Sequence, residues 1–426
     1  MNALNSQRPP STPVDSQDVE RQPRGGLLRP FTSLAYRDFR LLWFGQVAQA
    51  SSMWTEQVAR NWLTLELTGS ALQLGIVNLM RVGPSLALGL WGGVLADRFN
   101  KRKLLLIIQT WSFLVFSLMA WVVISGRLEL WHLYASAVAL SFGQSINQPV
   151  RTALIPSLLP QQYVLQALSL NSIAINATRL GGPALVALLI VYSNAGWAYA
   201  LSSGFYALML LSTVHIHIPP IEVRQRSASL LDDLKEGIGY VMGNRLILAL
   251  LLMPIGPLAF AFSFQTLLPV FAVRTLDMGA GAYGALLSVA GVGALVAGLA
   301  IASRGVIPRQ GLLELGVGVL YGVTIIALGG VQWFWAAVPL ILVASGSQTI
   351  FRASNSSLLL RNTPSELRGR VMGLTVISQS MMPVAAVFGG FLADTFGIGV
   401  AFVSIGTACV AIVLAVAVWE PRIRHL

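Results

Sequence analysis

The chain has 426 residues, of which 55% are hydrophobic and only 11% are charged. Soluble proteins carry about 25% charged residues, so this composition excludes soluble enzymes, secreted domains and disordered regulators. Lys and Arg outnumber Asp and Glu by 28 to 17, and the net charge of +11 raises nucleic acid as a possible partner. The positions of the basic residues along the chain decide that question.

The first 36 residues are polar and rich in proline, and they contain no apolar core of signal-peptide length. This composition predicts a disordered cytoplasmic tail at 1–36 rather than a cleaved targeting segment.

Apolar runs of membrane-spanning length fill most of the remaining chain. A helix needs about 20 apolar residues to cross about 30 Å of hydrocarbon. Such runs lie near 39–65, 72–96, 103–125, 130–153, 164–192, 195–217, 245–273, 280–303, 310–329, 333–355, 369–393 and 397–419. Every backbone group must be satisfied inside lipid, and the sequence lacks the alternating pattern of a β-barrel, so these runs predict helices. The predicted fold class is an all-α membrane protein with twelve transmembrane helices.

The runs divide into two groups of six. We predict an N-terminal six-helix bundle at 37–217, a cytoplasmic linker with an interfacial helix at 218–244, a C-terminal six-helix bundle at 245–420 and a short cytoplasmic tail at 421–426. Residues 141–170 align without gaps on residues 345–374, with Gln144 on Gln348 and Pro160 on Pro364. The bundles are therefore expected to be pseudo-symmetric, as in many secondary transporters.

The basic residues predict the orientation in the membrane. Of the 28 Lys and Arg residues, only Arg127 and Arg274 fall in predicted external loops, and only Arg60, Arg81 and Arg179 fall inside predicted spans. The others lie on the side of the two chain ends, which the positive-inside rule assigns to the cytoplasm. The positive charge thus orients a membrane protein with both termini cytoplasmic, and it requires no nucleic-acid partner. We expect the protein to lie in the plasma membrane, the inner membrane of a bacterium.

Polar side chains recur at helical spacing within the spans. A charge at the bilayer centre costs about 2.5–3.5 kcal/mol on insertion scales, so these stripes are expected to face a shared central cavity rather than lipid. The candidate cavity and substrate residues are Gln49, Arg60, Asn78, Arg81, Gln144, Gln148, Asn176, Arg179, Gln265, Gln348 and Gln379. Trp54 and Trp62 lie beside the first stripe and are candidates for substrate stacking.

Two carboxylates are candidates for proton coupling. Glu56 is the first, because a nearby Arg60 or Arg81 could favour the ionised form while burial favours the neutral form. The alternative is that Glu56 and Arg60 form a fixed pair at i,i+4 that only stabilises the first span. Glu314 is the second candidate.

The sequence predicts neither a cofactor nor a metal site. A single cysteine, Cys409, lies in an apolar run, and the four histidines flank or end hydrophobic segments. No HExxH, CxxC, GxSxG or GxxxxGK[ST] string occurs, so catalytic residues and ATP binding are not expected, and the protein is not predicted to be an enzyme.

The loop between the second and third spans reads Gly92-Gly-Val-Leu-Ala-Asp-Arg-Phe-Asn-Lys-Arg-Lys103. It resembles the G-x-x-x-D-R-x-G-R-[RK] loop of the major facilitator superfamily. The matching residues are Gly93, Asp97, Arg98, Lys101 and Arg102, while Asn100 replaces the second glycine of the family motif. We expect a cytoplasmic latch in which Asp97 contacts the start of the eleventh span near Arg368 or Arg370. The alternative is that these arginines only set the topology.

Other stretches are similar to the bacterial drug and siderophore exporter branch of that superfamily, which includes enterobactin exporters. These are 31–43, 66–70 and 148–156, and the resemblance covers about residues 31–420. It implies the major facilitator fold and proton antiport of drugs or siderophore-like metabolites. The fifth span keeps Gly182-Pro183 of the antiporter motif but lacks the later glycine pair.

We therefore expect a secondary active transporter that exports small amphipathic molecules by proton antiport and alternating access. Its partners would be a small-molecule substrate, protons and the lipid bilayer, and it would act as a monomer. One alternative is a facilitator or proton symporter that imports a nutrient or moves a lysolipid. A more distant alternative is a non-transporting membrane protein or an intramembrane enzyme.

Overall fold

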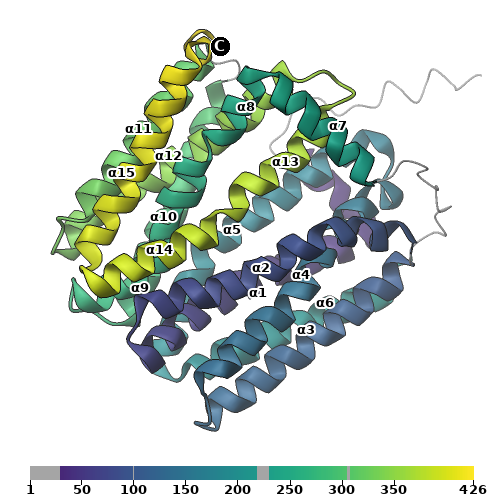
Figure 1. Ribbon diagram of the computed structural model, residues 1–426. Helices are drawn as coiled ribbons and strands as arrows, with labels where there is room; N and C mark the ends of the chain where they lie inside the picture. Colours follow the sequence, from purple (N-terminus) through teal and green to yellow (C-terminus); the bar gives the residue numbers. More distant parts are fainter. Residues whose placement is uncertain (1–28, 99, 218–229, 305–307) are drawn as a thin grey trace, which may run out of the picture.

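The computed structural model describes residues 29–98, 100–217, 230–304 and 308–426, and every regular element in these ranges is helical (Figure 1). The elements are η1 Arg29–Ala35, α1 Arg37–Thr68, α2 Ala71–Arg98, α3 Lys101–Ile124, α4 Leu130–Leu158, α5 Gln161–Tyr192, α6 Ala195–His215, α7 Leu230–Gly243, α8 Arg245–Leu252, η2 Ile255–Phe260, η3 Ala261–Ser263, α9 Phe264–Arg274, α10 Ala280–Arg304, α11 Gln310–Leu328, α12 Phe334–Asn362, α13 Arg368–Ser380, α14 Met382–Thr395, α15 Ile398–Trp419 and η4 Pro421–His425.

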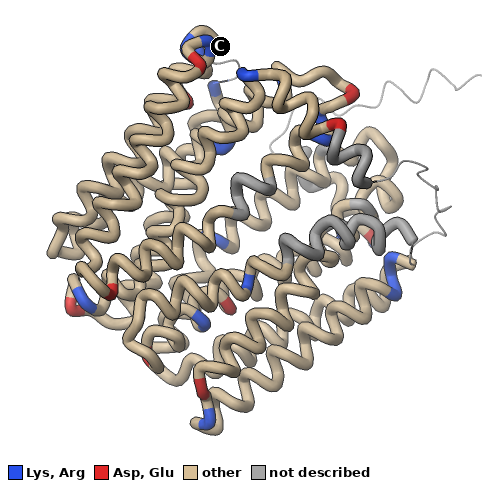
Figure 2. Tube along the Cα trace, viewed as in Figure 1, with Lys and Arg blue, Asp and Glu red and all other residues tan. Residues whose placement is uncertain are grey.

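The prediction of an all-α membrane protein is confirmed. Within the described ranges, 8 helical segments are long and apolar enough to cross a bilayer. The helix α1 is 32 residues long but is not among the eight, because it carries many polar and charged residues. Along the other helices, charged residues lie mostly near the helix ends, with a few inside the bundle (Figure 2). The eleventh predicted span is divided at Met381 into α13 and α14. The count of twelve spans stays a prediction.

The helices form two groups that lie against each other. Figure 1 shows α1 to α4 and α6 on one side of the molecule and α8 to α12 with α15 on the other. Two pairs of helices join the groups, α2 with α14 and α5 with α10. Each pair combines the second helix of one group with the fifth span of the other, which is the arrangement expected of a duplicated fold.

We name the two ends of the helical bundle by the chain segments that lie there, independently of its orientation in the membrane. We call the end where α1 begins at Arg37 and α15 ends at Trp419 the tail side, and the end where α1 stops at Thr68 the far side. Successive membrane-length segments alternate between these two sides.

Glycines allow the two groups to approach closely in the half of the bundle toward the far side. A Cβ placed on Gly75 of α2 would lie 2.6 Å from the Cα of Val387 of α14. A Cβ on Gly291 of α10 would lie 3.0 Å from the Cα of Leu180 of α5. Because only glycine permits backbones to pack this closely, a larger side chain at either position would separate the groups.

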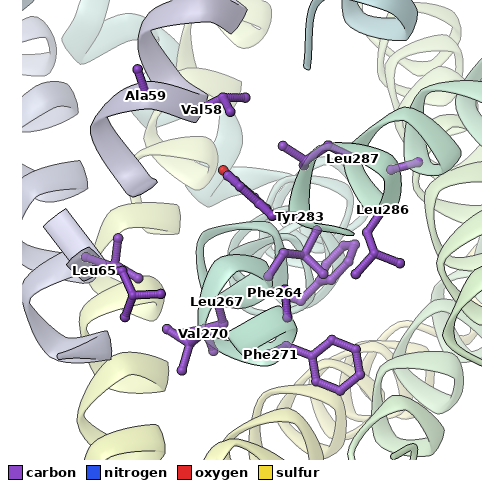
Figure 3. Close-up of a cluster of buried hydrophobic side chains, with 14 of the residues drawn as sticks. Val58, Ala59, Leu65, Phe264, Leu267, Val270, Phe271, Tyr283, Leu286 and Leu287 are labelled. Atoms are coloured by element: carbon purple, nitrogen blue, oxygen red, sulfur yellow. The ribbon is translucent and has the colours of Figure 1, made fainter. Parts of the chain in front are cut away.

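A buried hydrophobic cluster extends across both groups on the same side of the molecule. Figure 3 shows Phe264 and Phe271 of α9 beside Leu286 of α10, with Val58 of α1 nearby. The side chains of Val58, Phe264 and Leu286 have no exposed surface. In the membrane the hydrophobic effect adds little between helices, so this packing stabilises the closed interface mainly through van der Waals contact.

The segment Arg245–Arg274 crosses the bundle as a broken helix. The helix α8 ends at Leu252, and a π-helical turn at Ile255–Phe260 follows Pro254 before α9 begins at Phe264. Proline removes a backbone donor, and π turns widen a helix locally. Discontinuous helices of this kind are characteristic of transporter binding sites.

The predicted linker contains the helix α7. The linker residues before it, 218–229, lie outside the described residues. Glu236 of α7 forms an ion pair with Arg370 of α13, and Gly237 lies against the Cβ of Arg370. The linker helix therefore packs on the tail-side end of α13.

Candidate functional site

A carboxylate and two arginines form a buried cluster between α1 and α2. The Nε of Arg60 lies 2.5 Å from Oε1 of Glu56, and the Nε of Arg81 lies 3.6 Å from Oε2. Glu56 and Arg60 are each only 3% exposed, and Arg81 is 13% exposed. Arg81 also donates a hydrogen bond from Nη2 to Oε1 of Gln144 on α4. The sequence proposed Arg60 or Arg81 as the partner of Glu56, and the structure contains both contacts.

The cluster continues to the second group of helices through the predicted Asn78 and through Asn61 and Tyr283, which the sequence analysis did not select. Asn78 donates a hydrogen bond of 3.0 Å to Oδ1 of Asn61, and Asn61 donates one of 3.3 Å to the hydroxyl of Tyr283 on α10. Arg60 contacts Asn61 at 3.5 Å. A polar chain thus runs from Glu56 to α10. Asn61 could have been selected from the sequence, because it is a polar residue within a predicted span. Nothing in the sequence marked Tyr283 as a site residue.

Arg179 of α5 makes a second contact between the groups. Its Nη2 donates to Oε1 of Gln348 on α12 at 3.4 Å, and its guanidinium lies 5.6 Å from the centre of the Trp54 ring. Trp54 is 8% exposed and its Nε1 has no hydrogen-bond partner. Gln144 and Gln348, which coincide in the internal alignment, therefore each accept a hydrogen bond from an arginine.

The other predicted cavity residues are distributed around this region. Gln49 and Gln265 are buried at 8% and 3% exposure, and each has an amide atom without a hydrogen-bond partner. Gln148 and Asn176 are exposed on the tail-side halves of α4 and α5. The side chain of Gln379 lies outside the described residues. Trp62, the other stacking candidate, is partly buried against the hydrophobic cluster.

Glu314 forms a separate site on α11. Its side chain is fully buried, and Oε1 accepts a hydrogen bond of 2.7 Å from Nδ2 of Asn355. The other carboxylate oxygen has no hydrogen-bond partner. Within the described parts of the chain no basic residue forms an ion pair with Glu314. A buried charge without a partner is costly, so this environment suits a neutral carboxyl group.

Two arginines assigned to the ends of spans lie well inside helices. Arg151 is seven residues before the end of α4, is 2% exposed and donates a hydrogen bond of 3.2 Å to Gln46 of α1. Arg352 lies ten residues before the end of α12, which is about 15 Å at 1.5 Å per residue. Arg352 therefore lies deeper in its helix than the predicted span end at 355 indicated, because α12 continues to Asn362, and its assignment to the topology-setting charges stays a prediction.

The predicted latch falls mostly on undescribed side chains. The backbone of Gly93, Asp97 and Arg98 belongs to α2, but the side chains of 85–98 lie outside the described residues, so the latch stays a prediction. Lys101 begins α3, and Arg102 donates to the carbonyl of Val214. Arg368 donates to the carbonyl of Thr363 at 3.2 Å.

Asn100, which replaces the second glycine of the family motif, does not adopt a left-handed backbone conformation. Its φ is −60°, and its side chain accepts hydrogen bonds from the backbone N–H groups of Arg102 and Lys103. Asn100 is therefore the N-cap of α3.

A group of polar contacts, which we call the far-side clamp, joins the two helix groups at the far side. It consists of Gly69, Ser70, Ala71, Leu72, Arg274 and Asp394. Asp394 of α14 accepts hydrogen bonds of 2.9 Å from the backbone N–H groups of Ala71 and Leu72 and one of 2.6 Å from Ser70. Arg274 of α9 lies 3.0 Å from Asp394 and donates to the carbonyl of Gly69. An acidic residue of one group thus caps the N-terminus of α2 in the other.

No group of His, Cys, Asp and Glu side chains with metal-binding geometry occurs among the described residues. Cys409 is a free, buried thiol. The residues at hand offer ion pairs, amides and guanidinium groups between two helix bundles. This set can bind a polar or charged solute and release it again.

The fold and this interior site define a membrane transporter, and comparisons with known proteins agree. A family model described as transmembrane secretion effector matches residues 28–425. The chain belongs to this family of the major facilitator superfamily and is a secondary transporter of small molecules.

Relatives of known function are similar over most of the chain. The staphyloferrin A transporter of Staphylococcus aureus is 27% identical, and the match covers 84% of this chain and 91% of that protein. Macrolide efflux protein A of Streptococcus pyogenes is 23% identical over 88% and 94% of the two chains. The enterobactin exporter of Shigella dysenteriae is 24% identical over 72% and 73%. The resemblance to the drug and siderophore exporter branch is therefore confirmed.

A solved structure agrees with the fold. A nucleoside transporter superposes with a TM-score of 0.70 at 14% identity, covering 89% of this chain and 98% of that one. The likeness establishes the major facilitator fold.

Proposed function

We propose that this transporter exports small amphipathic molecules by proton antiport. The observation that carries the proposal is the Glu56–Arg60–Arg81 cluster, a buried ionisable group connected through Asn61 to Tyr283 of the opposite helix group. A carboxylate whose arginine partner is connected to the opposite body changes its surroundings when the two bodies move. The names of the relatives, which include exporters and an efflux protein, support export.

Alternating access follows from the two groups of helices, 37–217 and 245–420, acting as bodies joined by the linker at 218–244. The glycine contacts and the far-side clamp support a conformation closed at the far side. The exposed polar residues Gln148 and Asn176 support access from the tail side. The distribution of basic residues supports a cytoplasmic tail side, with both termini on the cytoplasmic face of the bacterial inner membrane. The protein acts as a monomer.

Glu56 is the proton-coupling residue in this proposal. In the conformation described here, Arg60 and Arg81 stabilise the ionised carboxylate, so a proton carried by Glu56 would leave toward the tail side. Opening of the far side would break the Asn61–Tyr283 contact and loosen the arginines, which would let Glu56 take up a proton from outside. Protons then move inward while substrate moves outward. Glu314 is less suited, because its described hydrogen bond goes to Asn355 within the same helix group, whereas the Glu56 cluster is connected through Asn61 to Tyr283 of the opposite group.

The proposal predicts flux driven by a pH gradient. Liposomes containing the protein would be loaded with rhodamine 123 or with fluorescein, two dyes with related ring systems and opposite charge. An acidic exterior should accelerate loss of at least one dye several-fold over protein-free liposomes, and a protonophore should abolish the acceleration. Absence of any gradient-dependent flux would contradict transport by proton antiport. Uptake together with protons would instead identify the importing alternative.

A further inference from the structure

Two arginines in the interior lack an acidic partner. Glu56 lies between Arg60 and Arg81, but no ion pair involving Arg179 or Arg352 occurs in the described parts of the chain. Among the described residues, the Arg179 guanidinium interacts with the neutral groups of Gln348 and Trp54. Arg179 is partly buried and Arg352 is exposed, although each lies ten or more residues from the ends of its helix. Arginines this deep in a membrane protein line a ligand site or a water-filled path, so both guanidinium groups are accessible to a charged solute.

The two guanidinium groups face the same region from opposite bodies. Arg179 is on α5, and its guanidinium reaches Gln348 of α12 at 3.4 Å. Arg352 follows Gln348 by four residues on α12, so the two side chains lie on one face of that helix, about one turn apart. The charges of Arg179 and Arg352 act on each other, and both act on the buried side chain of Tyr321. The hydroxyl of Tyr321 has no hydrogen-bond partner.

Arg352 also lines a pocket of mixed character. The polar lining comes from Arg352, Asn355 and Ser356 of α12, together with a threonine of α13. The apolar lining consists of Leu251, Pro254 and Leu258, from the broken helix Arg245–Arg274. The pocket thus offers a cation, hydrogen-bonding groups and an apolar wall around a space of about 20 Å³, which admits one small group such as a carboxylate.

We propose that Arg179 and Arg352 together bind the anionic group, a carboxylate, of the transported molecule, with its apolar part against Leu251, Pro254 and Leu258. This inference rests on the proposed function and adds the charge of its substrate. Without an anion the two guanidinium groups repel each other and hold the helix groups apart. A bound carboxylate bridges α5 and α12, removes the repulsion and lets the tail side close around the substrate. Only the loaded transporter would then change conformation readily.

Equilibrium binding tests the site without requiring transport. Fluorescein, which carries a carboxylate, would be titrated with the purified protein in a neutral detergent free of anionic lipid, and its anisotropy measured. Rhodamine 123, in which the carboxyl group is esterified and the ring system is cationic, is the matched probe. We expect fluorescein to bind at least tenfold more tightly than rhodamine 123.

The variants Arg179→Gln and Arg352→Gln should each weaken fluorescein binding at least tenfold and leave rhodamine 123 binding unchanged or stronger. Arg352→Lys keeps the charge and should lose less. Arg127→Gln, an exposed far-side change beside Trp121, is the control and should bind like the unaltered protein. Gel filtration and thermal unfolding would show that each variant is folded.

Several outcomes would overturn the inference. Equal binding of both dyes, no binding of fluorescein, or fluorescein binding that survives both substitutions would each exclude the two arginines as an anion site. Displacement of fluorescein by phosphatidylglycerol but not by citrate would assign the arginines to a lipid headgroup instead. If gradient-driven rhodamine flux persists while both substitutions leave fluorescein binding unchanged, export stands and only the anion site is excluded. Tight fluorescein binding without any gradient-driven flux would leave the anion site standing and contradict the proposed export.

Discussion

Glu56→Gln is expected to abolish pH-driven flux while leaving substrate exchange without a gradient measurable. Gln cannot carry the proton, so the inward proton movement that drives export is lost. The substitution also leaves Arg60 and Arg81 buried without a counter-charge, and loss of one partner of a buried ion pair costs about 3–5 kcal/mol. Dye flux with and without a pH gradient, together with the unfolding temperature in detergent, measures both effects.

A second variant separates coupling from stability. Glu56→Gln combined with Arg60→Gln removes one of the two uncompensated charges and should recover part of the lost stability. If Glu56 couples protons, the double variant remains unable to use the pH gradient. If Glu56 and Arg60 only stabilise α1, recovery of stability should restore the gradient-driven flux as well, which would refute the coupling role. Glu66→Gln, an exposed change on the same helix, is the control and should alter neither property.

Asp394→Ala is expected to open the far side more often. The side chain accepts hydrogen bonds from Ser70, Ala71 and Leu72 and pairs with Arg274. Loss of a helix N-cap costs about 0.5–2 kcal/mol, and about 1.4 kcal/mol corresponds to a tenfold change in an equilibrium. The population open to the far side should therefore rise by roughly tenfold.

Thiol labelling measures this shift. Cys409 is the only cysteine of the sequence, so a Cys409→Ser background with Ala71→Cys places one reporter in the closed interface, where Ala71 has no exposed surface. A membrane-impermeant maleimide should label this cysteine about tenfold faster when Asp394 is replaced by Ala. Asp277→Asn, an exposed far-side change, should have no effect. Unchanged labelling in Asp394→Ala would show that the clamp does not control far-side opening.

The helical membrane fold was predictable from the sequence because it depends on long apolar runs. The ends of the spans were less predictable where polar residues face the interior. Gln348, Arg352 and Asn355 lower the hydropathy of the tenth span, so the predicted span ended at 355 although α12 continues to Asn362. The same effect keeps α1, with its polar and charged residues, out of the segments that are apolar enough to cross a bilayer.

In the candidate site, local contacts were predictable from the sequence and long-range contacts were not. The contact of Glu56 with Arg60 follows from helical spacing and was predictable. The contacts of Asn61 with Tyr283 and of Arg179 with Gln348 join residues separated by 222 and 169 positions. Such contacts depend on how the two groups of helices pack, and a single sequence carries no information about that packing.

The glycine contacts at the far side have a bioenergetic consequence. Where Gly75 lies against Val387 and Gly291 against Leu180, backbone meets backbone, and no space remains for a file of water molecules that could conduct protons. A cell that keeps an electrochemical gradient across its membrane loses energy through any transporter that leaks. For the proton antiport proposed above, such close backbone packing would prevent ions from leaking through the far side between transport cycles.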